Sequence, residues 1–595
     1  MDTNQKINQV GVNIQEKAAV IWNVANSLFG AYKPHEYGLV ILPMVVIKRF
    51  HDCLLATHDK VVATYKSVQN LAVKDPFLLR ASGYKFYNTS EYTFEKLKAD
   101  PENIKTNFEA YLNGFSDNIM DILARMDFFT QLERMNNAGL LYQVVSDFCT
   151  EKADMNPEKI SAVDMGYIFE NLVQRFSESY DEEAGAHFTS RDIIYLMCDL
   201  LTDRLEMSEE GRIYTAYDMA MGTSQMLTCM EERLSSFDKA ANLICYGQEI
   251  NPFTFGIAKA DMLIRGGDPE NMQFGDTLSD DKFKGMTFDF VISNPPFGID
   301  WKREAVKVEE EHKLGNGGRF APGLPPKSDG QMLFLMNGLA KLKDDGRMAI
   351  IQNGSSLFTG DAGSGPSEIR RYIIENDWLD AIVQLPTDSF YNTGIATYIW
   401  LITKNKPLSH REHVQLIDAS KCSVPRRKPI GKKRVDISRD ARDLIVKAYG
   451  DYRDDYYETT ADDGYKIVVK TKVLSSLSLG YNKVTIESPA TYENGELILK
   501  KGQMIADSSK RDTENVPLDE DIDEYFKREV LPYNPNAWID HSKDRVGYEI
   551  PFTRTFYEYE MLEPAADIAS RIEQHEEQLM TDLKELFEEG GKNNA

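Results

Sequence analysis

The sequence predicts an α/β protein in which a mainly parallel sheet stands between an N-terminal helical domain and a C-terminal extension that ends in a helix. Three observations predict this class. Apolar residues recur at helical spacing through the first part of the chain. Short apolar segments then alternate with helical ones, as in sheets whose strands are joined by crossover helices. The last segment is an acidic helix with a narrow apolar stripe. We expect domains at residues 1–158, 159–475 and 476–595.

The first domain is expected to be a helical docking domain. Helical spacing is clearest in residues 16–32 and 37–54, and residues 118–135 form a later helical stretch. Nothing in this region has catalytic spacing.

The second domain is expected to contain the sheet. Two Gly- and Pro-rich stretches, residues 312–330 and 358–367, interrupt it, and long loops at strand ends are normally functional or disordered. The expected strands lie within residues 212–220, 243–250, 288–297, 347–354, 379–386 and 396–404.

The C-terminal part is expected to be polar and irregular from about residue 405 to 560. The terminal helix has its apolar stripe at spacings of three and four, which suits a contact with one other helix, in this chain or in a partner. The stripe consists of Ile568, Ile572, His575, Leu579, Leu583 and Leu586.

Composition narrows the class of protein. At 595 residues the chain is too long for one core, and 42% apolar residues indicate ordinary globular folding. No apolar run approaches the roughly 20 residues that span a bilayer. The N-terminus lacks the features of a signal peptide, and the six cysteines form no CxxC pair. We expect a cytoplasmic protein with no membrane association and no metal site.

The charge balance points to a subunit. Lys and Arg number 68 against 94 Asp and Glu, so the net charge is −26. A protein that grips DNA alone is usually basic, because phosphate neutralisation supplies most of its non-specific affinity. A DNA-modifying role therefore requires local positive charge or a partner that holds the duplex. The seven cations between Lys421 and Arg434 are either a solvated loop or such a phosphate contact.

The strongest chemical signal is the tetrad Asn294-Pro295-Pro296-Phe297, which follows an apolar strand. A strand exit with an Asn turn would be the structural interpretation. The functional interpretation is amine methylation. An exocyclic amine of adenine is a poor nucleophile, and an Asn side-chain carbonyl and a backbone carbonyl can each accept one of its hydrogens. Two prolines fix the backbone and leave rigid carbonyls, while the aromatic ring can stack on a base rotated out of the duplex.

A methyl-donor site is predicted before the tetrad. Asp218 ends a strand, and Gly222 in the turn that follows would let the backbone approach the methionine part of the donor. Glu249 ends the next strand, where an acid commonly takes ribose hydroxyls. Asp276 is a third acid at a strand end, and it is suited to bind the adenine amine of the methyl donor. Each acid alone is more often a loop or capping residue, but three in strand order favour a binding site.

With these motifs in view, the chain resembles the modification subunit of type I restriction enzymes, an N6-adenine DNA methyltransferase family. The matching segments run from about residue 160 to 440 and include GAHFTSR at 185–191, YGQEINPF at 246–253, FGDTL at 274–278 and ISNPPFG at 292–298. Further family-like stretches are residues 318–335, 346–358, 368–402 and 546–557.

The resemblance implies a doubly wound, Rossmann-like methyltransferase domain that uses S-adenosylmethionine and acts on adenine N6 in double-stranded DNA. It implies a DNA-specificity subunit that chooses the site, two copies of this chain for each specificity subunit, and a restriction subunit in the larger complex. The C-terminal extension would dock on the specificity subunit. The implied catalytic residues are Asn294, Pro295, Pro296 and Phe297, and the implied cofactor-binding residues are His187, Phe188, Thr189, Asp218, Met219, Ala220, Gly222, Thr223, Ser224, Gln225, Glu249, Ile250, Asp276, Thr277 and Asn294.

Two departures from the family pattern motivate an alternative function. The family's first motif is usually DPACGSGG, whereas Ser224 and Gln225 stand here at its second and third glycines. Either a Cβ there crowds the cofactor, or the loop is a lineage variant with compensating geometry. The family's Thr-Pro is Thr189-Ser190. A catalytically impaired assembly subunit of a DNA-defence complex is therefore the second hypothesis. The intact tetrad and acids favour activity.

Other enzyme classes fit less well. An NPP-aromatic tetrad also serves RNA, protein-glutamine and cytosine-N4 methyltransferases, but the motif order and the long flanking matches favour DNA adenine. A nucleotide-dependent dehydrogenase is disfavoured because the turn lacks GxGxxG spacing and the tetrad would have no task.

Overall fold

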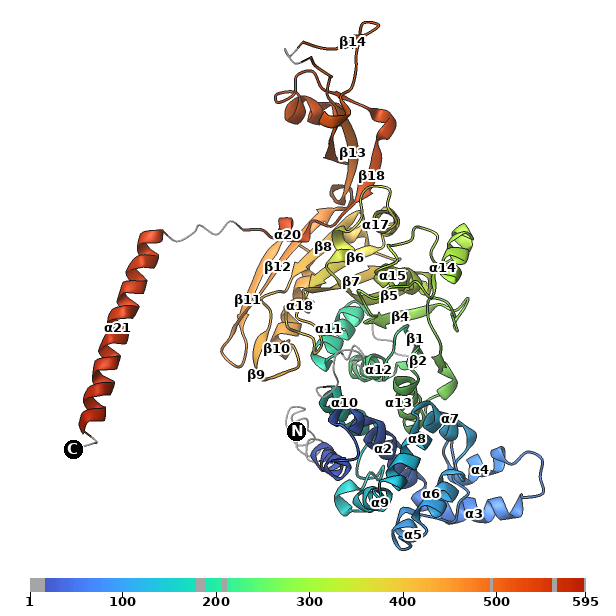
Figure 1. Ribbon diagram of the computed structural model, residues 1–595. Coiled ribbons are helices and arrows are strands. Elements are labelled where there is room, and N and C mark those ends of the chain that lie inside the picture. The colour runs from blue at the N-terminus through green and yellow to red at the C-terminus, as the bar shows by residue number, and fades with distance from the viewer. Residues whose placement is uncertain (1–16, 178–188, 206–210, 493–495, 559–563, 593–595) are drawn as a thin grey trace. The chain divides into compact units, whose positions relative to one another are not determined.

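The computed structural model describes residues 17–177, 189–205, 211–492, 496–558 and 564–592 (Figure 1). The chain divides into two compact units, Met1–Ile550 and Pro551–Ala595. Within the described ranges no helix combines the length and the hydropathy that crossing a membrane requires.

The N-terminal region is helical, as predicted. Its central helix, α2 (Tyr37–Leu54), is buried along nearly its whole length. Asp127, with φ +55°, separates α7 from α8 in the stretch predicted to be one helical run. The other helices of this region are α3 (His58–Ser67), α4 (Asp75–Ser82), α5 (Phe94–Lys98), α6 (Ile104–Leu112), α7 (Asp117–Arg125), α8 (Phe128–Asn137), α9 (Leu141–Phe148) and α10 (Ala162–Ser177).

The helical region shares its core with α13 (Pro252–Ile264), a helix of the sheet domain. Gly256 allows the close approach of α7, because a Cβ there would lie 2.7 Å from Met126 Cγ. Asn251 caps α13 by accepting from the amides of Phe253 and Thr254, and Pro252 occupies the first helical position, where no amide is needed.

The sheet has ten strands in the order β11-β12-β8-β6-β7-β5-β4-β1-β2-β3. Strands β1 to β5 run parallel, and β7 is antiparallel to both β5 and β6. All six residues of β4 are buried, as expected of a strand covered on both faces. The strands are β1 (Ile213–Asp218), β2 (Asn242–Glu249), β3 (Met272–Phe274), β4 (Phe288–Ser293), β5 (Leu342–Asn353), β6 (Leu379–Gln384), β7 (Thr397–Thr403), β8 (His413–Asp418), β11 (Asp455–Thr460) and β12 (Lys466–Ser475).

Helices cover both faces of the sheet, which makes it doubly wound as expected. Four helices, α11 (Arg191–Thr202), α12 (Gln225–Phe237), α13 and α18 (Arg439–Asp451), contribute to the core on one face. The other face carries α15 (Gln331–Ala340), which packs on β5, and α17 (Gly365–Glu375) beside it. Two shorter helices, α14 (Ala305–His312) and α16 (Ser355–Phe358), lie in the connections.

The expectation that residues 405–560 are irregular is wrong. Strands β8, β11 and β12 and helix α18 complete the sheet domain, and β9 (Val424–Ile430) pairs with β10 (Lys433–Asp436) in a hairpin. A further sheet has β13 (Gly480–Glu487) at its centre. Its partners are β16 (Asp512–Pro517), β17 (Trp538–Ile539) and β18 (Arg545–Tyr548), and the same region contains the hairpin of β14 (Leu499–Lys500) and β15 (Gln503–Met504) and the short helix α19 (Ile522–Tyr525). The domain boundaries after residues 158 and 475 stay predictions.

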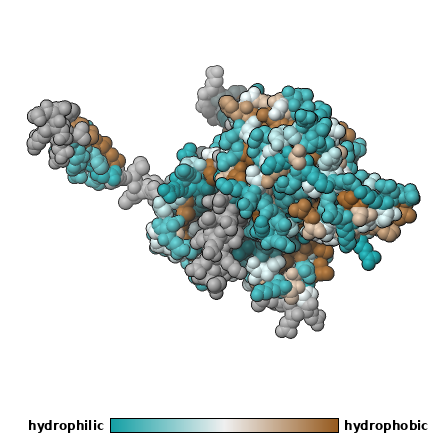
Figure 2. All heavy atoms as spheres, turned by 90° about the horizontal axis from the view of Figure 1, so that it is seen from below, coloured by the Kyte–Doolittle hydropathy of each residue, from teal (hydrophilic) through white to brown (hydrophobic). Residues whose placement is uncertain are grey.

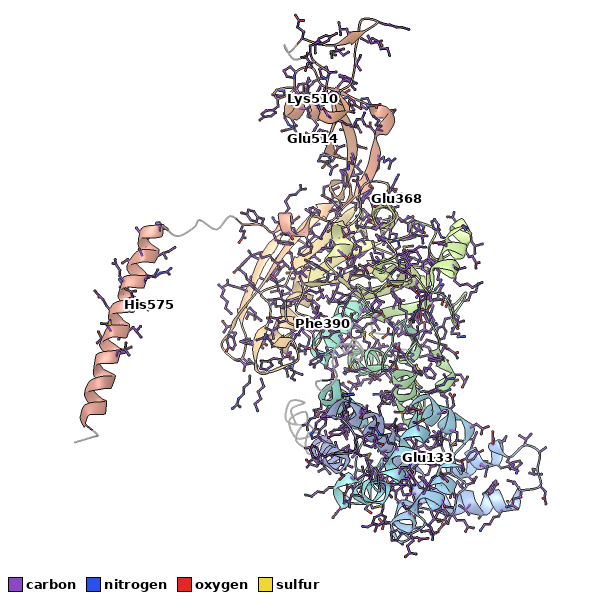
Figure 3. The ribbon with its side chains drawn as sticks, in the orientation of Figure 1. Glu133, Glu368, Phe390, Lys510, Glu514 and His575 are labelled. Carbon is purple, nitrogen blue, oxygen red and sulfur yellow. The ribbon has the colours of Figure 1, made fainter. Side chains whose placement is uncertain are left out.

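The second unit contains the predicted terminal helix, α21 (Ala565–Lys592), after the short α20 (Phe552–Thr555). Figure 2 shows hydrophobic side chains along one side of this helix, and Figure 3 places His575 on it. Ile572 and Leu579 of the apolar stripe are 55% and 59% exposed. The part of the stripe from Ile568 to Leu583 is therefore exposed.

Candidate active site

The sheet places the predicted site where its strand order reverses. From β1 the chain builds β2 and β3 on one side and returns to β4 on the other. In sheets of this kind ligands bind outside the carboxyl ends of the strands at such a switch point. Asp218 ends β1 and Ser293 ends β4, and the Ser293 hydroxyl donates to Asp218 Oδ1 at 2.7 Å. The predicted cofactor turn and the tetrad therefore meet at this edge.

The amide of Asn294 is buried and held in one orientation. Its Nδ2 donates to Thr189 Oγ1 at 2.8 Å, which directs Oδ1 away from that hydroxyl. Asn294 Oδ1 is buried and has no hydrogen-bond partner among the described residues. Buried polar atoms are nearly always paired in folded proteins, so an unpaired acceptor here marks a place for a donor from a ligand.

The rest of the tetrad continues along the same edge. Pro295 is buried, whereas Pro296 and Phe297 are partly exposed. The Phe297 ring packs against the core beneath the sheet. The aromatic side chain of the tetrad is therefore partly exposed at this edge of the sheet.

The glycine turn after β1 is tied to the end of β2 through Glu249. Gly222, with φ +53°, donates its amide to Glu249 Oε2 at 2.8 Å. The amide of Asn251 donates to Oε1 of the same carboxylate at 2.7 Å. Apart from its two chain neighbours, no atom of the described residues lies within 4 Å of the position that a Cβ of Gly222 would take, so the backbone is open to a ligand there.

The two departures from the family's glycines have different consequences. Ser224 adopts φ +70°, a left-handed conformation that favours glycine, and its amide donates to the Met221 carbonyl at 2.7 Å. The turn thus keeps a glycine-like path without the glycine. Gln225 begins α12, and its buried Nε2 has no partner within the described part of the chain.

The third predicted acid stabilises its own loop. Asp276 accepts hydrogen bonds from the amides of Leu278 and Ser279 at 3.1 and 3.2 Å. Thr277 Oγ1 donates to the carbonyl of Met219 at 2.5 Å, which joins this loop to the glycine turn. The tips of β1, β2 and β3 therefore lie together, and contact of Asp276 with an adenine amine stays a prediction.

The site is electrostatically prepared for a cation. Burial raises the pKa of Asp218 to about 7, against the opposing hydrogen bonds from Ser293 and Ala220. Burial also raises the pKa of Glu249. Among the described residues, no Lys, Arg or His acts on the pKa of either carboxylate. Desolvated carboxylates without a counter-charge would be stabilised by a positively charged ligand.

The remaining predicted residues fall into two groups. Met219 is buried, Ala220 and Thr223 are partly exposed, and Ile250 is 59% exposed beside Glu249. His187 and Phe188 lie outside the described residues.

Sequence reasoning missed the residue that holds the loop after the tetrad. Arg319 forms an ion pair with Glu311 at 2.7 Å and donates to the carbonyls of Thr277 and Leu278 at 2.7 and 3.0 Å. It fastens the Gly- and Pro-rich stretch at 312–330 to the loop that follows β3. The only sequence signal was a single Arg in a Gly- and Pro-rich stretch.

A second missed group lies at the end of β5. The Asp329 carboxylate accepts from the amide of Gly298, directly after the tetrad, at 3.2 Å. Gln331 Nε2 donates to Asp329, Asn353 and Ser355 at 2.7, 2.8 and 2.6 Å. The polar run after the strand segment at 347–354 was the available signal.

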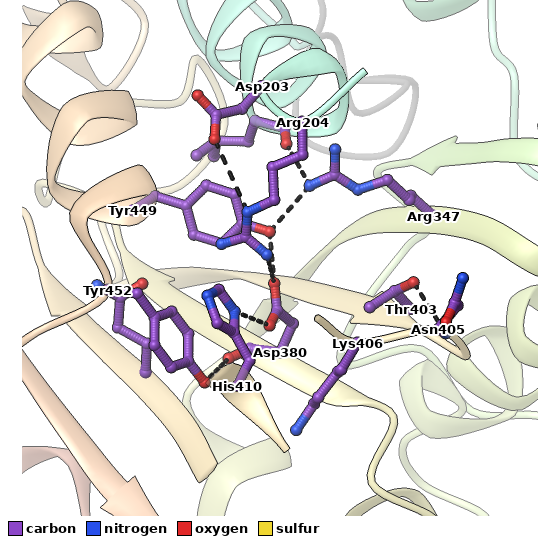
Figure 4. Close-up of polar contacts among 12 residues, drawn as sticks. Asp203, Arg204, Arg347, Asp380, Thr403, Asn405, Lys406, His410, Tyr449 and Tyr452 are labelled. Atoms are coloured by element: carbon purple, nitrogen blue, oxygen red, sulfur yellow. Dashed lines mark hydrogen bonds and ion pairs between the residues drawn. The ribbon is translucent and has the colours of Figure 1, made fainter. Parts of the chain in front are cut away.

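Figure 4 shows a buried titratable cluster that is not part of this site. Asp380 Oδ2 accepts from Arg204 at 3.0 Å and from the Tyr449 hydroxyl at 2.5 Å, and Asp380 Oδ1 lies 3.1 Å from His410 Nδ1. The His410 ring stacks on Tyr452. Asp380 is at the start of β6, at the opposite edge of the sheet from Asn294. The cluster supports the fold.

Comparison with known proteins agrees with this geometry. The family described as N-6 DNA Methylase matches residues 161–473, more than half of the chain. The chain belongs to the N-6 DNA methylase family. The HsdM N-terminal domain matches residues 17–148 of this methylase, within the helical region. The predicted family and fold class are confirmed, and with them the expected activity class, adenine-specific DNA methylation.

Individual relatives of the methylase are distant. The type I restriction enzyme MjaIX methylase subunit of Methanocaldococcus jannaschii is 25% identical over 67% of this chain and 71% of its own length. The HindI methylase subunit of Haemophilus influenzae is 27% identical over 52% of this chain and 64% of its own length. The crystal structure of a type I restriction-modification methyltransferase subunit from Streptococcus thermophilus, 21% identical, matches 78% of this chain and 97% of that chain with a TM-score of 0.61. The structural match supports the fold.

Proposed function

We propose that this chain transfers a methyl group from S-adenosylmethionine to N6 of adenine in double-stranded DNA, as the modification subunit of a type I restriction–modification complex. A specificity subunit chooses the site, with two copies of this chain for each specificity subunit, and a restriction subunit joins the larger assembly. The C-terminal helix α21 docks on the specificity subunit.

The observation that carries the proposal is the unpaired, buried Asn294 Oδ1 at the carboxyl end of β4. An adenine amine has two hydrogens, and Oδ1 is placed to accept one of them. A backbone carbonyl of the Pro295-Pro296 segment accepts the other. Together the two acceptors raise electron density on N6, and the methylated amine afterwards loses its proton without a base of unusual pKa. Phe297 stacks on the base that has left the duplex.

The residues present fit S-adenosylmethionine. Its positive charge suits the uncompensated carboxylates of Asp218 and Glu249, and the open backbone at Gly222 accommodates its methionine part. Glu249 retains lone pairs for ribose hydroxyls beside the two amides that it already accepts. When bound, the cofactor supplies a methyl group activated by the sulfonium charge. Asp276 and the segment at Thr189 complete the proposed contacts.

The test is transfer of a labelled methyl group to unmodified duplex DNA by the chain co-expressed with its specificity subunit. Asn294→Ala is expected to lower the rate about 100-fold or more, by analogy with loss of one preorganised polar group at a reacting centre. Asn376→Ala, an exposed Asn near the opposite edge of the sheet, is the matched control and should retain wild-type activity. Unchanged activity of Asn294→Ala would refute the assignment.

The second candidate function, a catalytically impaired assembly subunit, is favoured by Ser224 and Gln225 at the family's glycine positions. Calorimetric titration with S-adenosylmethionine separates the two. Binding that is lost in Glu249→Ala supports catalysis. A well-formed complex that binds no cofactor under any condition supports the assembly role.

A further inference from the structure

The hairpin of β9 and β10 concentrates positive charge in an acidic chain. Residues 421–436 contain seven cations and one carboxylate. Two of the cations are already paired with carboxylates of the chain. Lys433 is fully buried against Asp192, and Arg426 pairs with Asp436 at 2.5 Å. The other five are exposed and have no ion pair with a described carboxylate within 4 Å. These five, which we call the hairpin cations, are Lys421, Arg427, Lys428, Lys432 and Arg434.

The buried lysine anchors the hairpin to the first turn of α11. Lys433 Nζ donates to Asp192 Oδ2 at 2.9 Å and to the Ser389 carbonyl at 3.0 Å. The amide of Ile437 donates to the same carboxylate oxygen at 2.8 Å. Asp192 lies in the first turn of α11, three residues after the Thr189 that holds Asn294. The hairpin is thus fixed to α11, the helix that begins just after Thr189, and Figure 1 shows β10 and α11 near each other.

The hairpin also packs on the loop that follows β6. The amides of Lys432 and Arg434 donate to the carbonyls of Tyr391 and Asp388 at 2.8 and 2.9 Å. Gly431, with φ +54°, makes the approach possible, because a Cβ there would lie 2.4 Å from the Tyr391 carbonyl oxygen. Since β6 runs parallel to β4 and β5, this loop leaves the same sheet edge as the tetrad.

We propose that the hairpin cations contact the phosphates of the duplex on either side of the adenine presented to Asn294. This inference rests on the proposed function for the identity of the substrate. Phosphate contacts fix the register of a duplex and supply most of its non-specific affinity. The chain as a whole has a net charge of −26 and would repel DNA. The hairpin cations provide local positive charge that attracts the duplex to the sheet edge that carries the tetrad.

The test is the salt dependence of DNA binding by the complex of this chain with its specificity subunit, measured by fluorescence anisotropy with a labelled duplex of about two helical turns. The double variant Arg427→Ala with Lys428→Ala should bind DNA with a weaker salt dependence. The negative slope of log association constant against log salt concentration should shrink in magnitude by about 2, since each phosphate contact contributes roughly 0.9. Affinity at low salt should fall about tenfold or more, and affinity for S-adenosylmethionine should stay unchanged. Lys239→Ala with Lys447→Ala removes the same charge from exposed positions elsewhere on the sheet domain and should leave the slope unaltered.

An unchanged slope in Arg427→Ala with Lys428→Ala would overturn the proposal. Loss of the complex itself on size-exclusion chromatography would assign the hairpin to a protein contact and overturn it equally. Because binding is measured without methyl transfer, a wild-type complex that binds DNA with the expected slope but methylates nothing refutes the proposed function and leaves the phosphate contact standing.

Discussion

Thr189 orients the amide of Asn294, the proposed catalytic group, through one hydrogen bond, from Asn294 Nδ2 to Thr189 Oγ1. Thr189→Val removes the acceptor while keeping the shape, so the amide can rotate and Oδ1 is no longer fixed. We expect kcat to fall about tenfold, the cost of one net hydrogen bond of roughly 1–1.5 kcal/mol. Thr189→Ser keeps the acceptor and should restore kcat. Equal activity in Val and Ser variants, with equal thermal stability, would exclude a positioning role.

Asp218 should make cofactor binding depend on pH. Its pKa is raised to about 7 by burial, and a cation favours the ionised form, so binding strengthens as pH rises through 7. The contribution of this carboxylate at pH 6 should be about tenfold smaller than at pH 8. Asp218→Asn should remove the contribution of this carboxylate to cofactor binding. The ratio of wild-type to variant affinity, measured by calorimetry, should therefore rise about tenfold from pH 6 to pH 8. A ratio that is constant with pH would contradict the assignment.

The raised pKa of Asp218 also sets how the stability of the cofactor-free protein changes with pH. Because the folded pKa lies above the value of about 3.9 in an unfolded chain, the stability that Asp218 contributes is complete at low pH and is lost as pH rises through 7. Stabilisation of the protein by S-adenosylmethionine should accordingly be larger at pH 8 than at pH 6.

At the scale of elements, the cluster of Asp380, Arg204, His410 and Tyr449 stabilises the sheet at the amino end of β6. Burial alone would raise the pKa of Asp380, but the hydrogen bond to His410 and the charge of Arg204 outweigh it and lower this pKa to about 2. Asp380→Ala leaves Arg204 partly buried without its partner, so the free energy of unfolding should fall by about 3 kcal/mol. Asp345→Ala breaks the exposed ion pair with Arg212 and should cost about 1 kcal/mol or less. Chemical denaturation of the two variants checks the difference, and equal losses would be inconsistent with a supporting role for the cluster.

Sequence predicted the central strands of the sheet and the amphipathic terminal helix, and it missed strands such as β11 and β12. The run at 288–293 is buried throughout and was evident as a strand. By contrast, β11 is an edge strand with most of its residues exposed, and β12 alternates between buried and exposed positions, so their polar composition hid them. The acids at the strand ends could also be predicted, because each follows directly after an apolar strand segment in the sequence. The bond between Thr189 and Asn294 joins residues 105 positions apart and could come only from the fold.

At the scale of the whole molecule, the proposed docking helix and the proposed active site belong to different compact units. The apolar stripe of α21 has a period suited to one partner helix. Leu579→Asp should weaken the complex with the specificity subunit at least tenfold, while Gln574→Asp on the opposite side of the helix should leave it intact. Affinity for S-adenosylmethionine should be the same in both variants, because the proposed cofactor residues all lie in the first unit. Equal complex formation by both variants on size-exclusion chromatography would show that α21 is not the docking element.

The most direct measurement is the identity of the methylated nucleoside. Genomic DNA from cells that express the chain with its specificity subunit would be digested to nucleosides and examined by mass spectrometry. The geometry at Asn294 predicts N6-methyldeoxyadenosine, present with the wild type and absent with Asn294→Ala. N4-methyldeoxycytidine in its place, or no methylated nucleoside from a complex that assembles and binds S-adenosylmethionine, would contradict the central claim.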